Sequence, residues 1–155
     1  MGGFPAWLSE VPGMVVRSNN APFLDASKTY LDRLATELEP LLVTNGGPIL
    51  MAQIENEYGS YGSDYTYKAT LRDIFKDAFG ITLYTNDGGV EDDIIRGQIP
   101  GILAETDGDP KSGFDARNQY ADPTSLGPQL DGEYYITWLD LWASNSTYYT
   151  DVGSP

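Results

Sequence analysis

The stretch that decides the fold is GPILMAQIENEYG, residues 47–59. Within it, a continuous apolar run from Ile49 to Ile54 follows a Gly-Pro pair and leads directly into the polar segment 55–57. A short apolar run bounded by turn residues is typical of a strand buried on both faces of a parallel sheet. The stretch therefore predicts a buried strand with carboxylates directly after its end.

Strands and helices alternate on both sides of this strand. Apolar spacing and stop signals predict helices over 64–79 and near 91–97, and one to about residue 43 that Asp25 or Ser27 caps. The remaining segments are expected to be strands at 81–85, 99–104 and 130–135, and irregular structure at 2–8 and 109–128. Alternation of this kind predicts an α/β fold with a parallel sheet, either open or closed into a barrel.

The composition restricts the chemistry that is available. The chain has 155 residues, 41% of them hydrophobic, which is enough for one domain with a core. It contains no Cys and no His, so thiol nucleophiles, disulfides, the usual zinc sites and Ser-His pairs are excluded. An enzyme of this composition has to rely on carboxylates, Tyr or Lys.

The charge balance restricts the partners. Asp and Glu number 23 against 9 Lys and Arg, which gives a net charge of −14. Such a charge repels phosphate backbones and anionic lipid, so we expect no nucleic-acid and no membrane partner. A neutral substrate fits this charge, and so does calcium. We see no apolar run of about 20 residues and no signal peptide after Met1.

Two glutamates follow predicted strands, Glu57 after 49–54 and Glu133 within 130–135. A retaining glycosidase needs two carboxyl groups about 5–5.5 Å apart, one as acid and base and one as nucleophile. Like charges at that distance disfavour joint ionisation, which helps to keep the acid protonated. With 23 acidic residues in the chain, solvated or helix-capping carboxylates are the alternative interpretation.

The string at 47–59 resembles the signature of glycoside hydrolase family 35, the β-galactosidases. Four other segments resemble family segments in the same order, and the last of them leads to Trp138 and Trp142: these are 2–8, 17–23, 84–89 and 127–135. The likeness covers nearly the whole chain.

The resemblance implies a fold and an activity. The fold is a (β/α)8 TIM barrel, of which residues 1–155 would form one incomplete catalytic domain covering roughly strands four to seven. The activity is retaining hydrolysis of terminal non-reducing β-D-galactose, with a β-galactoside as partner and with no cofactor or metal. A secreted or lysosome- or vacuole-like location also follows from the resemblance, although the sequence itself leaves the compartment open.

The resemblance also implies residue roles. Glu57 is expected to be the acid/base and Glu133 the nucleophile. Asn56 is expected to hydrogen-bond the sugar 2-hydroxyl, with a strand-end turn residue as the alternative. Tyr134 and Tyr135 are expected to orient the nucleophile or line the sugar site, and plain packing is an equal alternative for both.

Glu55 is expected to support Glu57 or to form a structural pair. It would share a face with Glu57 if the strand continued to that point.

Several features depart from the family pattern. Asp131 and Gly132 stand where the family usually has Ser or Asn-Ser before the nucleophile, and Thr137 and Ala143 replace glycines. A barrel needs about 250 residues, and the segments for strands one to three and eight are not found in this chain. We expect the piece by itself to be unstable or to aggregate.

Three other interpretations remain open at this stage. One is a non-catalytic module that binds carbohydrate, or calcium through the acidic loop 107–113. Another is a degenerate, truncated homologue without activity. The third is the same chemistry on a different β-linked sugar.

Overall fold

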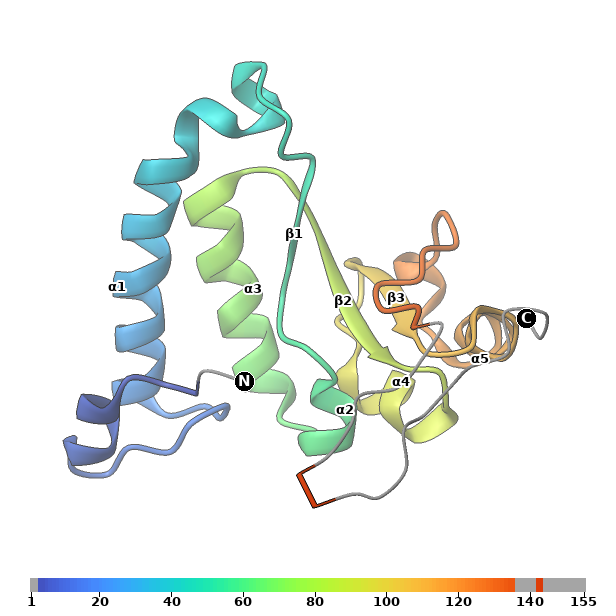
Figure 1. Cartoon of the computed structure of the whole chain (residues 1–155), viewed down its shortest axis with the longest axis horizontal. Coiled ribbons are helices and arrows are strands. Elements are labelled where there is room, and N and C mark those ends of the chain that lie inside the picture. Colours follow the sequence, from blue (N-terminus) through green and yellow to red (C-terminus); the bar gives the residue numbers. More distant parts are fainter. Residues whose placement is uncertain (1–2, 136–141, 144–155) are drawn as a thin grey trace.

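The computed structural model describes residues 3–135 and 142–143 of the chain. Helices lie beside a three-stranded parallel sheet with the order β1-β2-β3 (Figure 1). The strands are β1 (Met51–Gln53), β2 (Thr82–Gly88) and β3 (Leu103–Asp107). The α/β class and the parallel pairing predicted from the sequence are therefore confirmed.

In the described part of the chain, five α-helices connect or flank the strands. They are α1 (Ala21–Leu38), α2 (Tyr58–Tyr61), α3 (Tyr65–Phe79), α4 (Glu91–Gly97) and α5 (Pro110–Tyr120). Short 3-10 turns cover Ala6–Glu10, Glu39–Leu41, Val43–Asn45 and Pro123–Ser125. Across the described residues, no helix is both long and apolar enough to cross a membrane.

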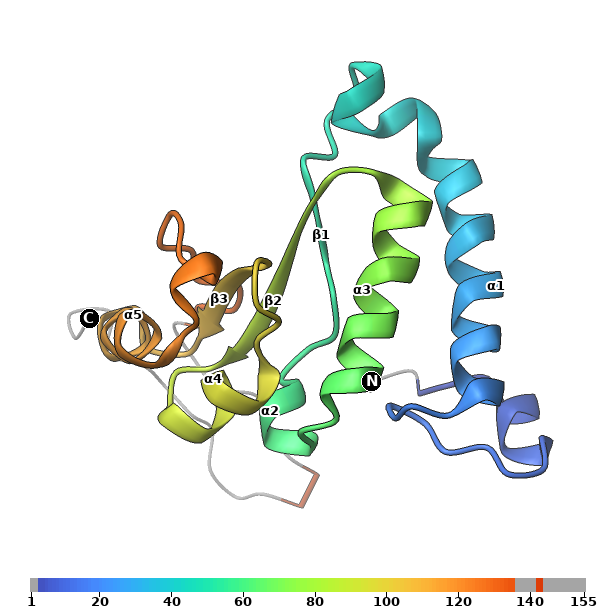
Figure 2. The same ribbon diagram turned by 180° about the vertical axis from the view of Figure 1, so that it is seen from behind.

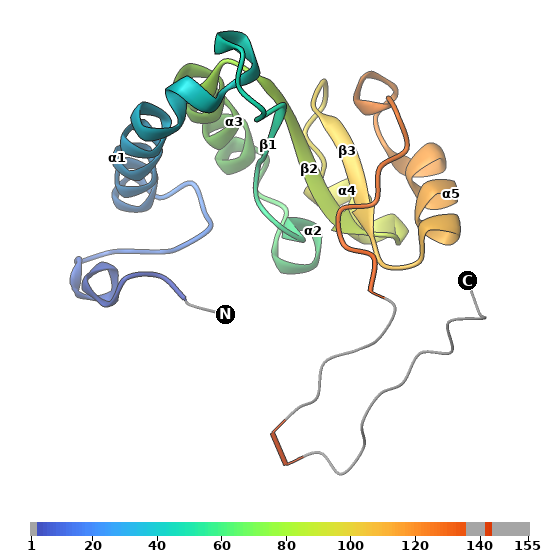
Figure 3. The same cartoon turned by 45° about the horizontal axis from the view of Figure 1, so that its top comes forward.

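The predicted fourth strand is reduced to a short parallel contact beside β3. Thr106 and Asp131 form an isolated parallel bridge. The Gly132 N–H donates to the carbonyl of Thr106 at 2.9 Å, and the Gly108 N–H donates to that of Glu133 at 3.1 Å. Figure 3 shows this segment running alongside β3. Four chain segments thus lie side by side in the order in which they occur in the sequence.

The hydrophobic core lies between α1, α3 and the first two strands. Its members are buried apolar side chains, among them Phe23, Leu31, Ile54, Tyr67, Leu71 and Leu83. Of the predicted strand 49–54, only Ile54 is fully buried, while Met51, Ala52 and Gln53 are half-buried and Leu50 is exposed. The expectation of a strand buried on both faces was therefore wrong for these residues, because β1 is at the edge of the described sheet.

The start of α1 differs from the prediction. The helix begins at Ala21, and its cap is Asn20, whose Oδ1 accepts from the Phe23 N–H at 3.1 Å. Asp25 and Ser27 lie inside the helix, so neither is the cap. Pro22 explains the earlier start, because proline fits the first turn of a helix. The helix ends at Leu38, earlier than the expected end near residue 43, and a 3-10 turn that contains Pro40 follows it. Proline cannot continue the helical hydrogen bonding, which explains the earlier end.

The expectation of irregular structure over 109–128 was wrong, because α5 lies there. Asp109 caps it by accepting from the Ser112 N–H at 2.9 Å, and Pro110 stands in its first turn. The buried residues of this helix are Gly113 and Arg117. A buried face made of glycine and arginine carries no apolar period, which is why pattern reasoning missed the helix. The 3-10 turn at Ala6–Glu10 likewise replaces part of the expected loop at 2–8.

Helix α4 packs between α2 and α5, as the view from behind shows (Figure 2). The backbones of α2 and α4 come very close at Gly59. A Cβ atom at Gly59 would lie 1.9 Å from the carbonyl oxygen of Asp93. Glycine is therefore required at this position. The close contact with α4 holds α2, which begins directly after Glu57, in its place.

Candidate active site

The polar groups of the site lie at the carboxyl ends of the parallel strands. Glu57 follows β1, Asn86 is in β2 and Asp107 ends β3. Glu133 lies in the segment that pairs with β3. The charges of Glu57 and Glu133 both act on Asp107. The structure thus brings the two sequence-predicted glutamates to one edge of the sheet, around a third carboxyl group.

The carboxylate of Glu55 is held by hydrogen bonds from Arg17 and Tyr67. Nε and Nη2 of Arg17 lie 3.0 Å and 2.7 Å from Oε2 of Glu55. The Tyr67 hydroxyl donates to its other oxygen, and burial followed by the charge of Glu55 raises the pKa of Tyr67. The expectation that Glu55 forms a structural pair agrees with these contacts.

The chain turns sharply between the two glutamates. Glu55 has φ 63° and Glu57 has φ 49°, both in the left-handed region that non-glycine residues seldom adopt. The extended geometry that would put them on one face of a strand does not persist. Left-handed residues of this kind are typically found at functional sites. The Glu57 N–H donates to the carbonyl of Asn86 at 2.8 Å, which ties the turn to β2.

Asn56 lies between the two glutamates and is exposed. Its Oδ1 accepts from Nε2 of Gln53 at 2.8 Å, and Nδ2 of Asn86 is 3.5 Å away. Its backbone carbonyl accepts from Nη2 of Arg17 at 2.8 Å. These contacts orient the side-chain amide, so that its Nδ2 is left to donate to a ligand.

Glu133 is half-buried and is oriented by its neighbours. The Tyr135 hydroxyl donates to its Oε2 at 3.0 Å, and its own N–H donates to Oδ1 of Asp131 at 3.2 Å. The hydrogen bond to Glu133, followed by its charge, raises the pKa of Tyr135. Tyr134 and Tyr135 are both exposed. Of the two tyrosines, Tyr135 is the one whose hydroxyl donates to the carboxylate.

Asn86 is the central residue that sequence reasoning did not single out. Its side chain is buried, and its Nδ2 lies 3.1 Å from Oδ2 of Asp107 and 3.4 Å from Oε1 of Glu133. Because the oxygens around Nδ2 are acceptors, this orientation of the amide is the one that satisfies them. The available signal was its position: polar residues at the ends of neighbouring parallel strands meet at one edge.

Asp107 has an unusual proton affinity. Its pKa is raised to about 7, first by burial, then by the charge of Glu57 and a side-chain hydrogen bond to it, and then by the charges of Glu133 and Asp87. From the sequence, Asp107 was expected only as part of the acidic loop 107–113.

The calcium interpretation finds no support in the geometry of that loop. Asp109 uses its Oδ2 to cap α5, while Asp107 contacts Asn86 and Glu57. Over residues 3–135 and 142–143, no group of three or more acidic side chains is arranged to hold a metal ion.

Asp87 lies just behind the site and is buried. Its Oδ1 accepts from the Gly59 N–H at 3.0 Å. Burial is the main cause that raises its pKa to about 6, and the nearby Lys68 ammonium opposes this rise. Nζ of Lys68 donates to the carbonyls of Gln98, at 2.7 Å, and Arg96, so the lysine also closes the end of α4.

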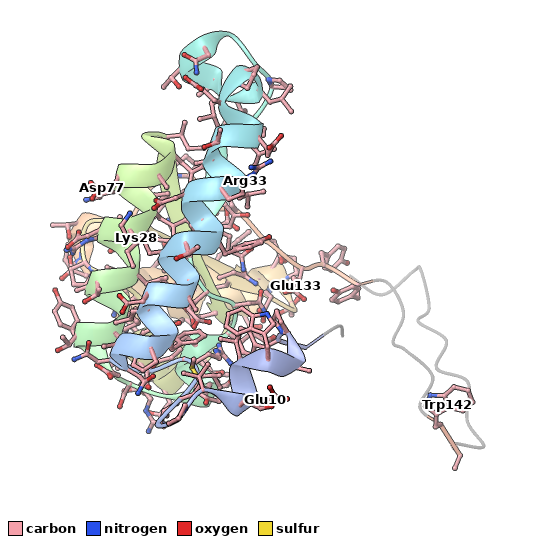
Figure 4. The ribbon with its side chains drawn as sticks, turned by 90° about the vertical axis from the view of Figure 1, so that its left-hand side faces the viewer. Glu10, Lys28, Arg33, Asp77, Glu133 and Trp142 are labelled. Carbon is pink, nitrogen blue, oxygen red and sulfur yellow. The ribbon has the colours of Figure 1, made fainter. Side chains whose placement is uncertain are left out.

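Two tryptophans among the described residues lie at the surface. Trp7 and Trp142 are exposed. Trp138 and Thr137 lie outside the described residues. Figure 4 shows Glu133 and Asp77 on opposite sides of the ribbon.

These features define a class of protein. It is an α/β protein with carboxyl groups gathered at the carboxyl ends of successive parallel strands, which is where α/β folds build their active sites.

Comparison with known proteins gives the family. The model of the glycosyl hydrolases family 35 matches residues 1–152, and the chain belongs to this family. It is 42% identical over 146 residues to a beta-galactosidase of Xanthomonas manihotis, covering 91% of this chain and 24% of that protein. A bovine (Bos taurus) beta-galactosidase is 40% identical over 148 residues, covering 92% and 22%.

A more distant relative gives the same picture. Beta-galactosidase 1 of Dictyostelium discoideum is 33% identical over 166 residues, which cover 98% of this chain and 24% of that protein. The chain therefore spans about a quarter of the length of the curated relatives it matches.

Proposed function

We propose that this chain supplies the acid/base and the nucleophile of a retaining β-galactosidase. The substrate would be a terminal non-reducing β-D-galactose residue. The observation that carries the proposal is that Glu57 and Glu133, from segments far apart in the sequence, both contact Asn86 at one edge of the sheet. The Glu57 N–H donates to the carbonyl of Asn86 at 2.8 Å, and Nδ2 of Asn86 lies 3.4 Å from Oε1 of Glu133. Membership of family 35, with relatives named beta-galactosidases, supports the substrate class.

The proposed reaction has two steps. In the first, a carboxylate oxygen of Glu133 bonds to the anomeric carbon, the glycosidic bond breaks and Glu57 gives its proton to the leaving oxygen. In the second, Glu57 takes a proton from water, and the water oxygen displaces Glu133 from the sugar. No cofactor takes part in this scheme, since two carboxyl groups are sufficient.

The contacts around Glu133 fit the role of a nucleophile. Donors lie near both of its oxygens, the Tyr135 hydroxyl at Oε2 and Nδ2 of Asn86 at Oε1. Two fixed donors hold the carboxylate in one orientation, and correct orientation is a large part of the rate enhancement in such reactions. Asn56 would donate its amide to the 2-hydroxyl, and Tyr134 would line the sugar site.

We also propose that the chain forms an arc of a (β/α)8 barrel, with β1, β2, β3 and residues 131–133 as strands four to seven. The order of these segments supports this, since it follows the sequence without reversal. An open doubly wound sheet reverses its order at a switch point. In Figure 3, α3 and α5 flank the strands and α4 passes behind them. Residues 1–155 would then be one incomplete catalytic domain.

The test measures kcat/KM of the complete polypeptide that contains these residues. The substrate is a chromogenic aryl β-galactoside. Glu57→Gln should lower kcat/KM by about 10²–10⁴-fold, the usual effect of losing an acid/base. Glu133→Gln should lower it further, because no glycosyl-enzyme can form. Glu10→Gln is the matched control, since Glu10 is exposed on a 3-10 turn and should leave turnover unchanged.

Three outcomes would contradict the proposal. Normal turnover by Glu133→Gln would rule out the nucleophile, and normal turnover by Glu57→Gln would rule out the acid/base. If the wild type binds galactose in titration calorimetry without any turnover, the protein is a binding module or an inactive homologue. Faster hydrolysis of another aryl β-glycoside would change the sugar but keep the mechanism.

A further inference from the structure

We propose that Arg17 is a positioning residue that holds the residues on both sides of Glu57 and thereby fixes the direction of the proposed acid/base. This inference rests on the proposed function, because it takes Glu57 as the acid/base. Arg17 acts through the turn that carries Glu57 and not on the sugar itself.

The guanidinium group of Arg17 holds the two residues that precede Glu57. Its Nε and Nη2 lie 3.0 Å and 2.7 Å from Oε2 of Glu55. Nη2 also donates to the backbone carbonyl of Asn56 at 2.8 Å. One planar group thus binds a side chain and a main-chain oxygen at successive positions, which requires the several fixed donors of a guanidinium.

The same group contacts the helix that follows Glu57. Cζ of Arg17 lies 4.2 Å from the centre of the Tyr61 ring and 5.5 Å from that of the Tyr58 ring. Both tyrosines are in α2, which begins directly after Glu57. The Tyr58 hydroxyl also donates to the backbone carbonyl of Arg17 at 3.4 Å. The residues before and after Glu57 are therefore tied to one arginine.

The backbone of this turn needs such support. Of the four non-glycine residues with positive φ in the described part of the chain, three are Arg17 (φ 51°), Glu55 (φ 63°) and Glu57 (φ 49°). This left-handed conformation is unfavourable for a residue with a side chain, and it persists where surrounding contacts enforce it. In a relaxed turn the Cα–Cβ bond of Glu57 would point in another direction. The contacts of Arg17 therefore help to determine where this carboxyl group lies.

Glu57 depends on its backbone for its direction. Its side chain is exposed, and its N–H donates to the carbonyl of Asn86 at 2.8 Å, which holds the main chain from the side of β2. Arg17 holds the turn from the opposite direction in the sequence, through a segment that lies 38 positions before Glu55. A change at Arg17 should therefore displace the carboxyl group without removing it.

The alternative is that the ion pair of Arg17 and Glu55 contributes only to stability. The two side chains are 22% and 12% exposed, so the pair is largely shielded from water. A purely structural role predicts less folded protein, and hence the same loss of rate with every substrate. Positioning of an acid/base predicts a loss that depends on how much the leaving group needs a proton.

The test compares two substrates in the complete polypeptide with Arg17→Lys. Lysine keeps the charge beside Glu55, but its single ammonium cannot also bind the Asn56 carbonyl and stack on Tyr61. A methoxyphenyl β-galactoside needs a proton on its leaving oxygen, whereas a dinitrophenyl β-galactoside does not. Because small displacements of a catalytic group are costly, kcat/KM should fall by about 10- to 100-fold with the first substrate and by less than about 3-fold with the second.

The second step of the reaction gives an independent signature. The proposed base acts on the glycosyl-enzyme whichever leaving group has departed, so hydrolysis of this intermediate should be slow in Arg17→Lys. With the dinitrophenyl substrate the intermediate then accumulates, and kcat and KM should fall together. A smaller amount of folded enzyme would lower kcat and leave KM unchanged.

A second variant tests the contact with α2 by itself. Tyr61 is 54% exposed, so Tyr61→Leu removes the ring from Arg17 without opening the core. Its loss should depend on the leaving group in the same way but be smaller, about 3-fold with the methoxyphenyl substrate. Tyr61→Phe keeps the ring and should keep the wild-type ratio of the two rates.

Arg33→Lys is the matched control for the charge-conserving change. Arg33 is also paired with a glutamate, Glu37, but the pair lies exposed on α1. Both values of kcat/KM should equal those of the wild type. Thermal melts report whether each variant folds.

The two proposals fail in different ways. If Glu57→Gln loses turnover but Arg17→Lys has wild-type rates with both substrates, the role of Arg17 is overturned and the proposed function stands. An equal loss with both substrates at unchanged KM overturns it as well, because Arg17 is then only structural. Normal turnover by Glu57→Gln would mean that the proposed function itself is wrong. If Arg17→Lys does not fold, Tyr61→Leu decides, and rates equal to those of Tyr61→Phe with both substrates overturn the inference.

Discussion

At the residue scale, neighbouring carboxylates of one turn have very different surroundings. Glu55 is held by Arg17 and Tyr67, with its side chain 12% exposed. Glu57 is exposed and faces Asp107 across the strand ends. The oxygens of Glu55 are already engaged by Arg17 and Tyr67, whereas the side chain of Glu57 is exposed at the strand ends. The surroundings therefore explain why Glu57, rather than Glu55, is proposed as the acid/base.

Asp87 allows a prediction about stability at this scale. Burial raises the pKa of Asp87 from its ordinary value of 3.8 to about 6 in the folded protein. The folded state therefore binds more protons than the unfolded state between these values, and the stability this provides is lost as the pH rises through that range. In Asp87→Asn this loss is absent. Measured by urea unfolding, the variant should gain stability relative to the wild type between pH 4 and 6, by up to about 3 kcal/mol.

The control for this prediction is Asp77→Asn, which removes a carboxylate from an exposed position. Its free energy of unfolding should follow that of the wild type at each pH. A constant difference between Asp87→Asn and the wild type across this range would contradict the raised pKa of Asp87. The comparison uses the difference between variants, so the other titrating groups cancel.

At the element scale, Arg117 links α5, β3 and the segment that leads to Glu133. Its side chain is 1% exposed. Nε donates to the carbonyl of Ala104 in β3, and Nη2 lies 3.2 Å from the carbonyls of Gly127 and Pro128. Residues 131–133 then pair with the end of β3. The guanidinium group therefore sets where the segment carrying the proposed nucleophile begins.

Loss of this link should affect stability and turnover together. Arg117→Ala leaves the three carbonyls without their donor, and we expect the free energy of unfolding to fall by about 3 kcal/mol or more. Turnover should also fall, because Glu133 would no longer be held at the strand ends. Chemical denaturation and kcat/KM measure the two effects.

Arg33→Ala is the matched control for this change. Arg33 is on α1, and its side chain is 77% exposed in an ion pair with Glu37. Exposed pairs of this kind contribute less than about 1 kcal/mol. An Arg117→Ala protein as stable as Arg33→Ala would refute the linking role.

At the scale of the whole molecule, the described sheet has an edge at β1. The residues of β1 are half-buried, and Leu50 just before it is 62% exposed. Parallel strands normally have both faces and both neighbours covered. An open edge with exposed apolar side chains is a site for association with other chains.

We therefore predict that residues 1–155 by themselves do not form a stable monomer. A purified sample should melt without cooperativity or elute as aggregates in size-exclusion chromatography. The complete polypeptide, with its β1 edge paired, should melt cooperatively. A monomeric 155-residue chain with a sharp melt and galactosidase turnover would show that this arc of strands is sufficient.

The sequence was informative where one signal dominated. The helices at 64–79 and 91–97 were predicted almost to the residue, because an apolar face or a clear stop marks them. Helix α5 was missed, because its buried positions are Gly113 and Arg117. The strand at 130–135 was predicted too long, because pairing beside β3 is confined to a few residues there.

The sequence by itself restricted the reactive groups that are available and indicated the family. Without Cys or His, carboxylates were the main reactive groups left, and the string at 47–59 was specific enough to indicate family 35, which the comparison confirmed. Both results depend only on which residues are present and in what order, and neither of these depends on folding.

Only the tertiary structure decided which other side chains meet the two glutamates. Asn86 and Asp107 come from different strands, and their contact with Glu57 and Glu133 depends on strand order and register. Their proton affinities depend on burial and on charges brought close by folding. Distances between segments far apart in the chain are set by packing. Packing depends on many segments at once, so no single stretch of the sequence predicts these distances.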